Sequence, residues 1–106
     1  MPAFGVTITY ATTEALLAAN RDAILALAER HGARNVRVFG SFARGDATET
    51  SDVDLLVSTT EHTSPWFPAG LELDLEQLLG RRVDVVTEDG PYWLLRQRVL
   101  REARPL

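Results

Sequence analysis

The fold of this chain is decided by residues 38–57, which read VFGSFARGDATETSDVDLLV. An apolar run leads into Gly40-Ser41, and ten residues later Asp52-Val53-Asp54 opens a second apolar run. Short apolar runs bounded by glycine and polar residues are typical of buried strands. The stretch therefore predicts a strand, a tight turn with a short helix, a polar loop and a second strand.

The two aspartates predict a metal site. Successive side chains of a strand point to opposite faces, so Asp52 and Asp54 share one face while Val53 turns toward the core. Two carboxylates offer the hard oxygen ligands that suit Mg²⁺, which usually binds one or two carboxylates together with substrate phosphates. We therefore expect Asp52 and Asp54 to be metal ligands and a nucleotide to complete the coordination.

The Gly-Ser turn predicts the phosphate end of the same site. Gly40 allows a ligand to approach the backbone closely, and Ser41 brings a hydroxyl to the start of a helix, where free amide groups favour anions. Arg44 follows about one helical turn later, and its guanidinium is suited to pair with phosphate oxygens. Gly40, Ser41 and Arg44 are therefore the predicted nucleotide-binding residues.

A third acid interrupts the apolar run RRVDVV at residues 81–86. If this strand pairs beside the one that carries Asp52 and Asp54, Asp84 joins them around two metal ions about 3.5–4 Å apart, an arrangement that clamps the attacking and leaving oxygens of an in-line displacement. Asp84 is also a candidate acceptor of the proton from the attacking hydroxyl. The predicted catalytic and metal-binding set is Asp52, Asp54 and Asp84.

A purely structural role for the motif is disfavoured. A Gly-Ser turn alone is usually only a turn, and Asp-x-Asp alone is often a solvated strand end, but the fixed spacing, the apolar flanks and the third acid occur together. The sequence contains neither G-x-G-x-x-G nor G-x-x-x-x-G-K-[ST]. A Rossmann or P-loop phosphate site is therefore a weak interpretation.

The motif, with the later RRVDVV, resembles the minimal nucleotidyltransferase (MNT) antitoxin family of the DNA polymerase beta superfamily. The resemblance covers nearly the whole chain except the first ten or so residues. It implies that Gly40 and Ser41 contact the triphosphate and that Asp52, Asp54 and Asp84 bind metal. Arg44 stands where the family commonly has a basic residue.

The resemblance also implies an activity and a partner. Stand-alone MNT proteins of this size are similar to the antitoxins of type VII-like toxin–antitoxin pairs, whose partner is a HEPN-domain ribonuclease toxin. The implied reaction transfers AMP from ATP, with Mg²⁺, to a tyrosine of that toxin. Two alternatives stay open: a binding antitoxin that inhibits by complex formation without catalysis, and a nucleotidyltransferase that acts on RNA or on a small molecule.

Length and composition agree with this interpretation. With 106 residues the chain is expected to be one minimal nucleotidyltransferase domain over 1–106, with 1–11 as an extended tail or edge strand. A net charge of −4 argues against direct binding of nucleic acid, which a basic surface would favour. The chain has no cysteine, which excludes disulfides and thiolate metal sites. The opening residues do not resemble a signal peptide and no run is long enough for a membrane span, so the expected location is the cytoplasm.

The fold class expected from these patterns is α/β (α+β), a polymerase beta-like nucleotidyltransferase fold with a small mixed sheet and helices packed on one side. A strand–helix–strand connection over residues 53–86 permits parallel neighbours, whereas the relative direction of the first two strands stays open. The last helix is basic, with Arg96, Arg98, Arg101 and Arg104, and this pattern is most simply a solvated face. The expected elements are helices over 13–31, 41–44, 71–79 and from Pro91 onward, and strands over 35–39, 53–58 and 82–86.

Overall fold

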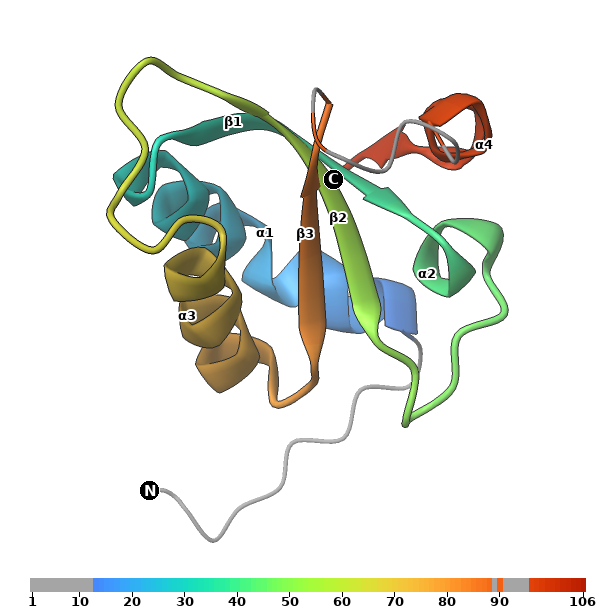
Figure 1. The fold of residues 1–106 in the computed structure, drawn as a ribbon. Coiled ribbons are helices and arrows are strands. Elements are labelled where there is room, and N and C mark those ends of the chain that lie inside the picture. The colour runs from blue at the N-terminus through green and yellow to red at the C-terminus, as the bar shows by residue number, and fades with distance from the viewer. Residues whose placement is uncertain (1–12, 89, 91–95) are drawn as a thin grey trace, which may run out of the picture.

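A four-stranded mixed sheet forms the centre of the molecule, with helices against one of its faces and at one of its ends (Figure 1). The computed structural model describes residues 13–88, 90 and 96–106. The predicted tail or edge strand over 1–11 and the predicted start of the last helix at Pro91 lie outside the described residues. The mixed sheet confirms the expected fold class.

The strands are β1 (Ala33–Phe39), β2 (Val53–Thr59), β3 (Val83–Thr87) and β4 (Arg104–Pro105), and their order in the sheet is β3-β2-β1-β4. β2 and β3 are parallel, as the helical crossover between them permits. β1 is antiparallel to β2, which settles the direction that the sequence left open, and it is also antiparallel to β4.

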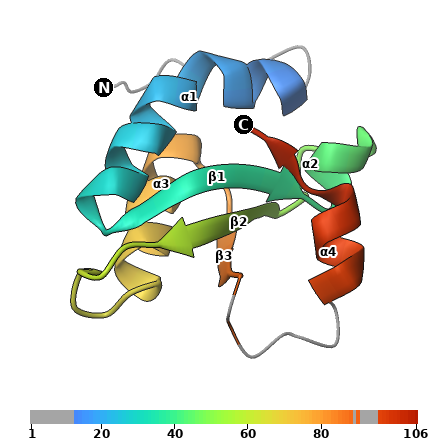
Figure 2. The same cartoon turned by 90° about the horizontal axis from the view of Figure 1, so that it is seen from above.

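The helices are α1 (Thr13–Arg30), α2 (Ser41–Arg44), α3 (Ala69–Leu79) and α4 (Arg96–Glu102). α1 and α3 cover one face of the sheet, whereas α2 and α4 lie at the end where β1 finishes (Figure 2). Within the described residues, none of the helices has the length and the apolar character needed to cross a bilayer.

The core lies between the sheet and the layer formed by α1 and α3. On β2 and β3 it takes alternate residues, because every second side chain points to that face. Burying one such side chain stabilises the fold by roughly 1.5–3 kcal/mol. The largest fully buried side chains are Ile24, Val53, Leu55, Val57, Leu71, Leu75 and Val83. Asp54, Asp84 and their neighbours lie on the opposite face of β2 and β3.

A histidine joins the end of α1 to the segment after β2 and to α3. Nδ1 of His31 lies 2.6 Å from Oγ of Ser64, and Nε2 lies 2.7 Å from Oδ2 of Asp74. Next to it Gly32 has a φ of +82°, and a Cβ at this position would collide with the backbone carbonyl of His62. Gly32 therefore meets two requirements at once, a left-handed turn at the end of α1 and close backbone contact.

Two glutamates of α3 bind the free edge of β3. Oε2 of Glu76 accepts a hydrogen bond of 3.1 Å from the amide of Val83, and Oε2 of Glu72 accepts one of 2.8 Å from the amide of Val85. The two acids are four residues apart, so they lie on the same side of the helix, one turn apart. They satisfy the edge amides on either side of Asp84 and so fix the backbone that carries this acid.

The observed elements differ from the predicted ones mainly at the C-terminus. The short helix over 41–44 is confirmed at both ends, and the other predicted elements within the described residues agree to within two residues. β4 was not predicted, and Arg104, expected in the last helix, belongs to this strand because α4 ends at Glu102. A two-residue strand carries no periodic pattern from which it could be recognised.

We expect Glu72→Ala and Glu76→Ala to lower the free energy of unfolding by about 1–3 kcal/mol each, because each change leaves an edge amide of β3 without its charged acceptor. Urea denaturation followed by circular dichroism measures this loss. Glu29→Ala, at an exposed position of α1, is the matched control and should be nearly neutral. Unchanged midpoints for both α3 variants would show that water serves these amides equally well.

Candidate active site

The parallel pairing of β2 with β3 places two predicted catalytic acids side by side. Asp54 is the register partner of Asp84, so the two side chains project from the same face of the sheet. Both carboxylates are partly buried, and they lie on the face opposite the core. The structure therefore brings together two acids that are thirty residues apart in the sequence.

The electrostatics of Asp54 reflect this crowding. Burial, followed by the negative charges of Asp84 and Asp52, raises the pKa of Asp54 from 3.8 to about 6, while the positive charge of Arg44 opposes the shift. Asp84, Asp52 and Arg44 are therefore all close enough to act on Asp54. A cation bound here would relieve the repulsion that raises the pKa.

Gly40 allows Asp54 to reach its position. Its φ of 71° and ψ of −149° lie in a region that is essentially reserved for glycine. A Cβ built on Gly40 would collide with Oδ2 of Asp54. The glycine of the motif thus provides the turn after β1 and also leaves room for the carboxylate of β2.

The short helix α2 begins directly after this glycine. Its first turn is closed by hydrogen bonds of 3.0 Å from the amides of Ala43 and Arg44 to the carbonyl of Gly40. Ser41 is the first helical residue, and the apolar side of the helix is anchored by Phe42, which is buried in the core. The anchored helix holds Ser41 and Arg44 at the end of β1, next to Asp54.

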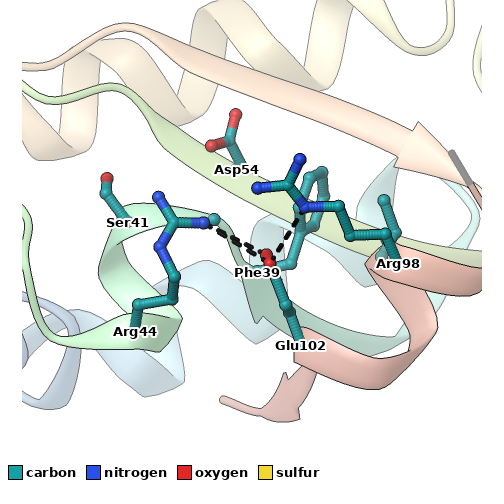
Figure 3. Close-up of a pocket in the computed structure, with 8 residues that line it drawn as sticks. Phe39, Ser41, Arg44, Asp54, Arg98 and Glu102 are labelled. Carbon is teal, nitrogen blue, oxygen red and sulfur yellow. Dashed lines mark hydrogen bonds and ion pairs between the residues drawn. The ribbon is translucent and has the colours of Figure 1, made fainter.

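A hollow of about 290 Å³ lies at this end of the sheet (Figure 3). It combines the motif turn with one acid of β2 and with part of the last helix. Its lining residues are Phe39, Gly40, Ser41, Arg44, Asp54, Arg98, Val99 and Glu102. The three predicted nucleotide-binding residues and one predicted catalytic acid therefore surround the same space.

A second hollow, of about 340 Å³, lies over the neighbouring part of the sheet. It is lined by Phe39, Asp54, Glu72, Asp84, Val85, Val86 and Val99. Phe39, Asp54 and Val99 border both hollows, so the two are adjacent, and Asp54 stands between the Gly-Ser turn and Asp84. The arrangement offers one space beside the predicted phosphate end and another beside the third acid.

Asp52 takes a more open position than the other two acids. It is exposed, directly precedes β2 and lines neither hollow. Across the described ranges, no three histidine, cysteine, aspartate or glutamate side chains form a cluster arranged to hold a metal ion. The structure thus pairs Asp54 with Asp84 and keeps Asp52 close enough to act electrostatically on Asp54. The three carboxylates do not form a complete metal-binding cluster in the described residues.

The donor set nevertheless fits Mg²⁺. Mg²⁺ prefers oxygen ligands, retains several waters and is commonly held by one or two carboxylates plus phosphate oxygens. Asp54 and Asp84 supply such a pair, and the pKa of Asp54 is raised by burial first and then by the negative charges of Asp84 and Asp52. The ligation by Asp52, Asp54 and Asp84 remains a prediction.

Two charged residues of the site, Arg98 and Glu102, were not predicted from the sequence. Oε1 of Glu102 lies 3.2 Å from Nη1 of Arg44, and Oε2 lies 3.4 Å from Nε of Arg98 (Figure 3). The only signal in the sequence is the spacing of four residues between Arg98 and Glu102 on one helix. The last helix comes close to the motif because β4 pairs with β1 at Val38, next to the Gly-Ser turn.

Comparisons with known proteins find relatives both in sequence and in fold. The protein adenylyltransferase MntA of Thermococcus cleftensis is 42% identical over 95 residues, which span 90% of this chain and 93% of the relative. A solved structure described as a minimal nucleotidyltransferase is 57% identical and superposes with a TM-score of 0.74, covering 85% of this chain and 92% of the other.

A toxin–antitoxin structure with AMP-PNP shares the fold. It is 23% identical, has a TM-score of 0.70 and covers 81% of this chain and 71% of the other. In addition, residues 21–106 match the family model of the nucleotidyltransferase domain. The matched residues include the whole Gly-Ser and Asp-x-Asp motif and Asp84. The resemblance noted in the sequence is thereby confirmed, and the chain belongs to the nucleotidyltransferase domain family.

Proposed function

We propose that this chain is an antitoxin that transfers AMP from ATP to a tyrosine hydroxyl of a HEPN-domain ribonuclease toxin and so neutralises it. The observation that carries the proposal is the position of Asp54, which borders both the hollow at the Gly-Ser turn and the hollow at Asp84. A triphosphate bound at the turn would present its α-phosphate to the acids.

In this proposal Gly40, Ser41 and Arg44 bind the triphosphate. All three line the first hollow, and Arg44 supplies positive charge beside Asp54. A guanidinium is well suited to phosphate because its donors form a planar fork. Asp52, Asp54 and Asp84 would hold Mg²⁺, which neutralises charge on the phosphates when it is bound.

The reaction is an in-line displacement at the α-phosphorus. The tyrosine oxygen forms a new bond to this phosphorus, the bond to the bridging oxygen of the β-phosphate breaks, and pyrophosphate leaves. The phenolic proton passes to a carboxylate, for which we propose Asp84. This acid borders the second hollow and not the first, so it lies on the side away from the Gly-Ser turn, where an acceptor could enter.

The partner is proposed from the relatives and from charge. MntA of Thermococcus cleftensis is named a protein adenylyltransferase, and the toxin–antitoxin structure with AMP-PNP shares this fold. The net charge of −4 suits a partner that binds RNA through a basic surface. A protein acceptor would supply the hydroxyl and close the open second hollow at the same time.

The double variant Asp52→Asn, Asp54→Asn is expected to fold but to lose AMP transfer by about 100-fold or more, because the charge that holds the metal and the nucleotide is gone. The measurement is the intact mass of the candidate HEPN toxin after incubation with this protein, ATP and Mg²⁺. Asp22→Asn, at an exposed site of α1, is the control and should add AMP normally.

Three outcomes separate the candidate functions. Added AMP on the toxin, lost in the double variant, supports the proposal. If the double variant still fully rescued the growth of cells that express the toxin, only inhibition by complex formation would remain. If labelled nucleotide from ATP were found on RNA and not on protein, the acceptor would be a different one.

A second prediction of this subsection concerns how the stability of the metal-free protein depends on pH. Because the pKa of Asp54 is raised to about 6 in the folded state, the folded protein keeps a proton between pH 3.8 and 6 that the unfolded chain has released. This stabilises the fold at low pH, and the contribution is lost as the pH rises through 6. The stability of Asp54→Asn relative to the wild type should therefore increase from pH 4 to pH 7.

Urea denaturation in EDTA at the two pH values tests this expectation. Adding Mg²⁺ at pH 7 should raise the melting temperature of the wild type more than that of Asp54→Asn. The ion binds the ionised carboxylate of Asp54 in the folded protein, and the variant lacks this ligand. An identical pH dependence for the two proteins would contradict the raised pKa of Asp54, which comes from burial and from the neighbouring carboxylates.

A further inference from the structure

Glu102 occupies a position between two cations of the first hollow. Its carboxylate accepts hydrogen bonds from Nη1 of Arg44 at 3.2 and 3.5 Å and from Nε of Arg98 at 3.4 Å. The two arginines come from different elements, α2 and α4, and converge on one pair of oxygens (Figure 3). Guanidinium groups bind phosphate oxygens through charge-assisted hydrogen bonds of the same kind.

The three side chains differ in how far they are exposed to solvent. The side chain of Glu102 is only 21% exposed, whereas those of Arg44 and Arg98 are 43% and 67% exposed. The acid is therefore held against the protein, while the two cations extend toward the open side of the hollow. Either arginine could exchange the carboxylate for another anion by rotating about its own side-chain bonds.

The charges within the hollow place a bound triphosphate in competition with Glu102. Its charged lining residues are Arg44 and Arg98 on one side and Asp54 and Glu102 on the other. A triphosphate entering this space brings several negative charges, so it meets repulsion from Asp54 and Glu102 and attraction from both arginines. Arg98 is free for the phosphates only when it releases Glu102, whereas Arg44 also has an ion pair of 3.4 Å with Asp46 to exchange.

We propose that Arg98 is a second phosphate-binding residue of the site, and that Glu102 occupies Arg44 and Arg98 in the free protein and competes with the triphosphate for them. The inference rests on the proposed function and extends it to a residue of the last helix. It gives the basic residues of this helix unequal roles, because Arg98 lines the hollow and Arg101 does not.

The test is the affinity for AMP-PNP with Mg²⁺, measured by isothermal titration calorimetry on the full chain. We expect Arg98→Ala to weaken binding about tenfold, with Arg98→Lys in between, because one charge-assisted contact is removed or kept only in part. Glu102→Gln should tighten binding by about threefold to tenfold, because the competing charge is gone. Arg101→Ala is the matched control and should bind as the wild type.

The opposite signs separate this role from a structural one. If the ion pairs only hold α4 in place, Arg98→Ala and Glu102→Gln should both weaken binding, and this result would overturn the inference. So would an Arg98→Ala variant that binds as tightly as the wild type. Circular dichroism confirms that each variant is folded.

The inference and the proposed function can fail separately. The binding measurement needs no toxin, so the expected pattern with AMP-PNP can be found even if no AMP is added to a partner. Conversely, equal binding by all variants together with normal AMP transfer to the toxin would remove Arg98 and Glu102 from the site and leave the proposed function intact. A wild type that binds no AMP-PNP would overturn both.

Discussion

The site depends on the register in which β2 and β3 pair. Asp54 and Asp84 are neighbours only because the two strands run parallel with these residues opposite each other. The same register buries Val53, Leu55 and Val83 on the other face, so the core and the acid pair cannot be changed independently. A slip by one residue would bring a carboxylate into the core and a valine to the site. Hydrophobic burial on one side of the sheet thus holds together like charges that repel one another on the other side.

The end of β1 is the second point where separate parts of the chain meet. The turn at Gly40 starts α2, leaves space for Asp54 and lies beside the pairing of Val38 with β4. β4 in turn brings α4 against the hollow, with Arg98 and Glu102. The motif is therefore local in the sequence, but the pocket around it is completed by the last helix. The cost of strain at Gly40 is small because glycine adopts a positive φ readily.

What could be predicted from the sequence was the part encoded locally. Alternation of apolar and acidic residues indicated the strands around Asp54 and Asp84, and Gly40, Ser41 and Arg44 marked a short helix whose limits are confirmed. The direction of β1, the strand β4 and the contacts of Glu72 and Glu102 depend on contacts between distant segments, and no periodic pattern in the sequence encodes them. The family and the fold class are confirmed, while the chemical roles of the individual site residues stay predictions.

The two margins of the sheet limit how the protein can associate with others. On one side Glu72 and Glu76 already occupy amides of β3 that an incoming strand would need. On the other side β4 has two residues and ends in Pro105, which has no amide hydrogen to donate. Within the part of the chain that the structure describes, neither edge is a good template for adding a further strand, so extension of the sheet from molecule to molecule is disfavoured.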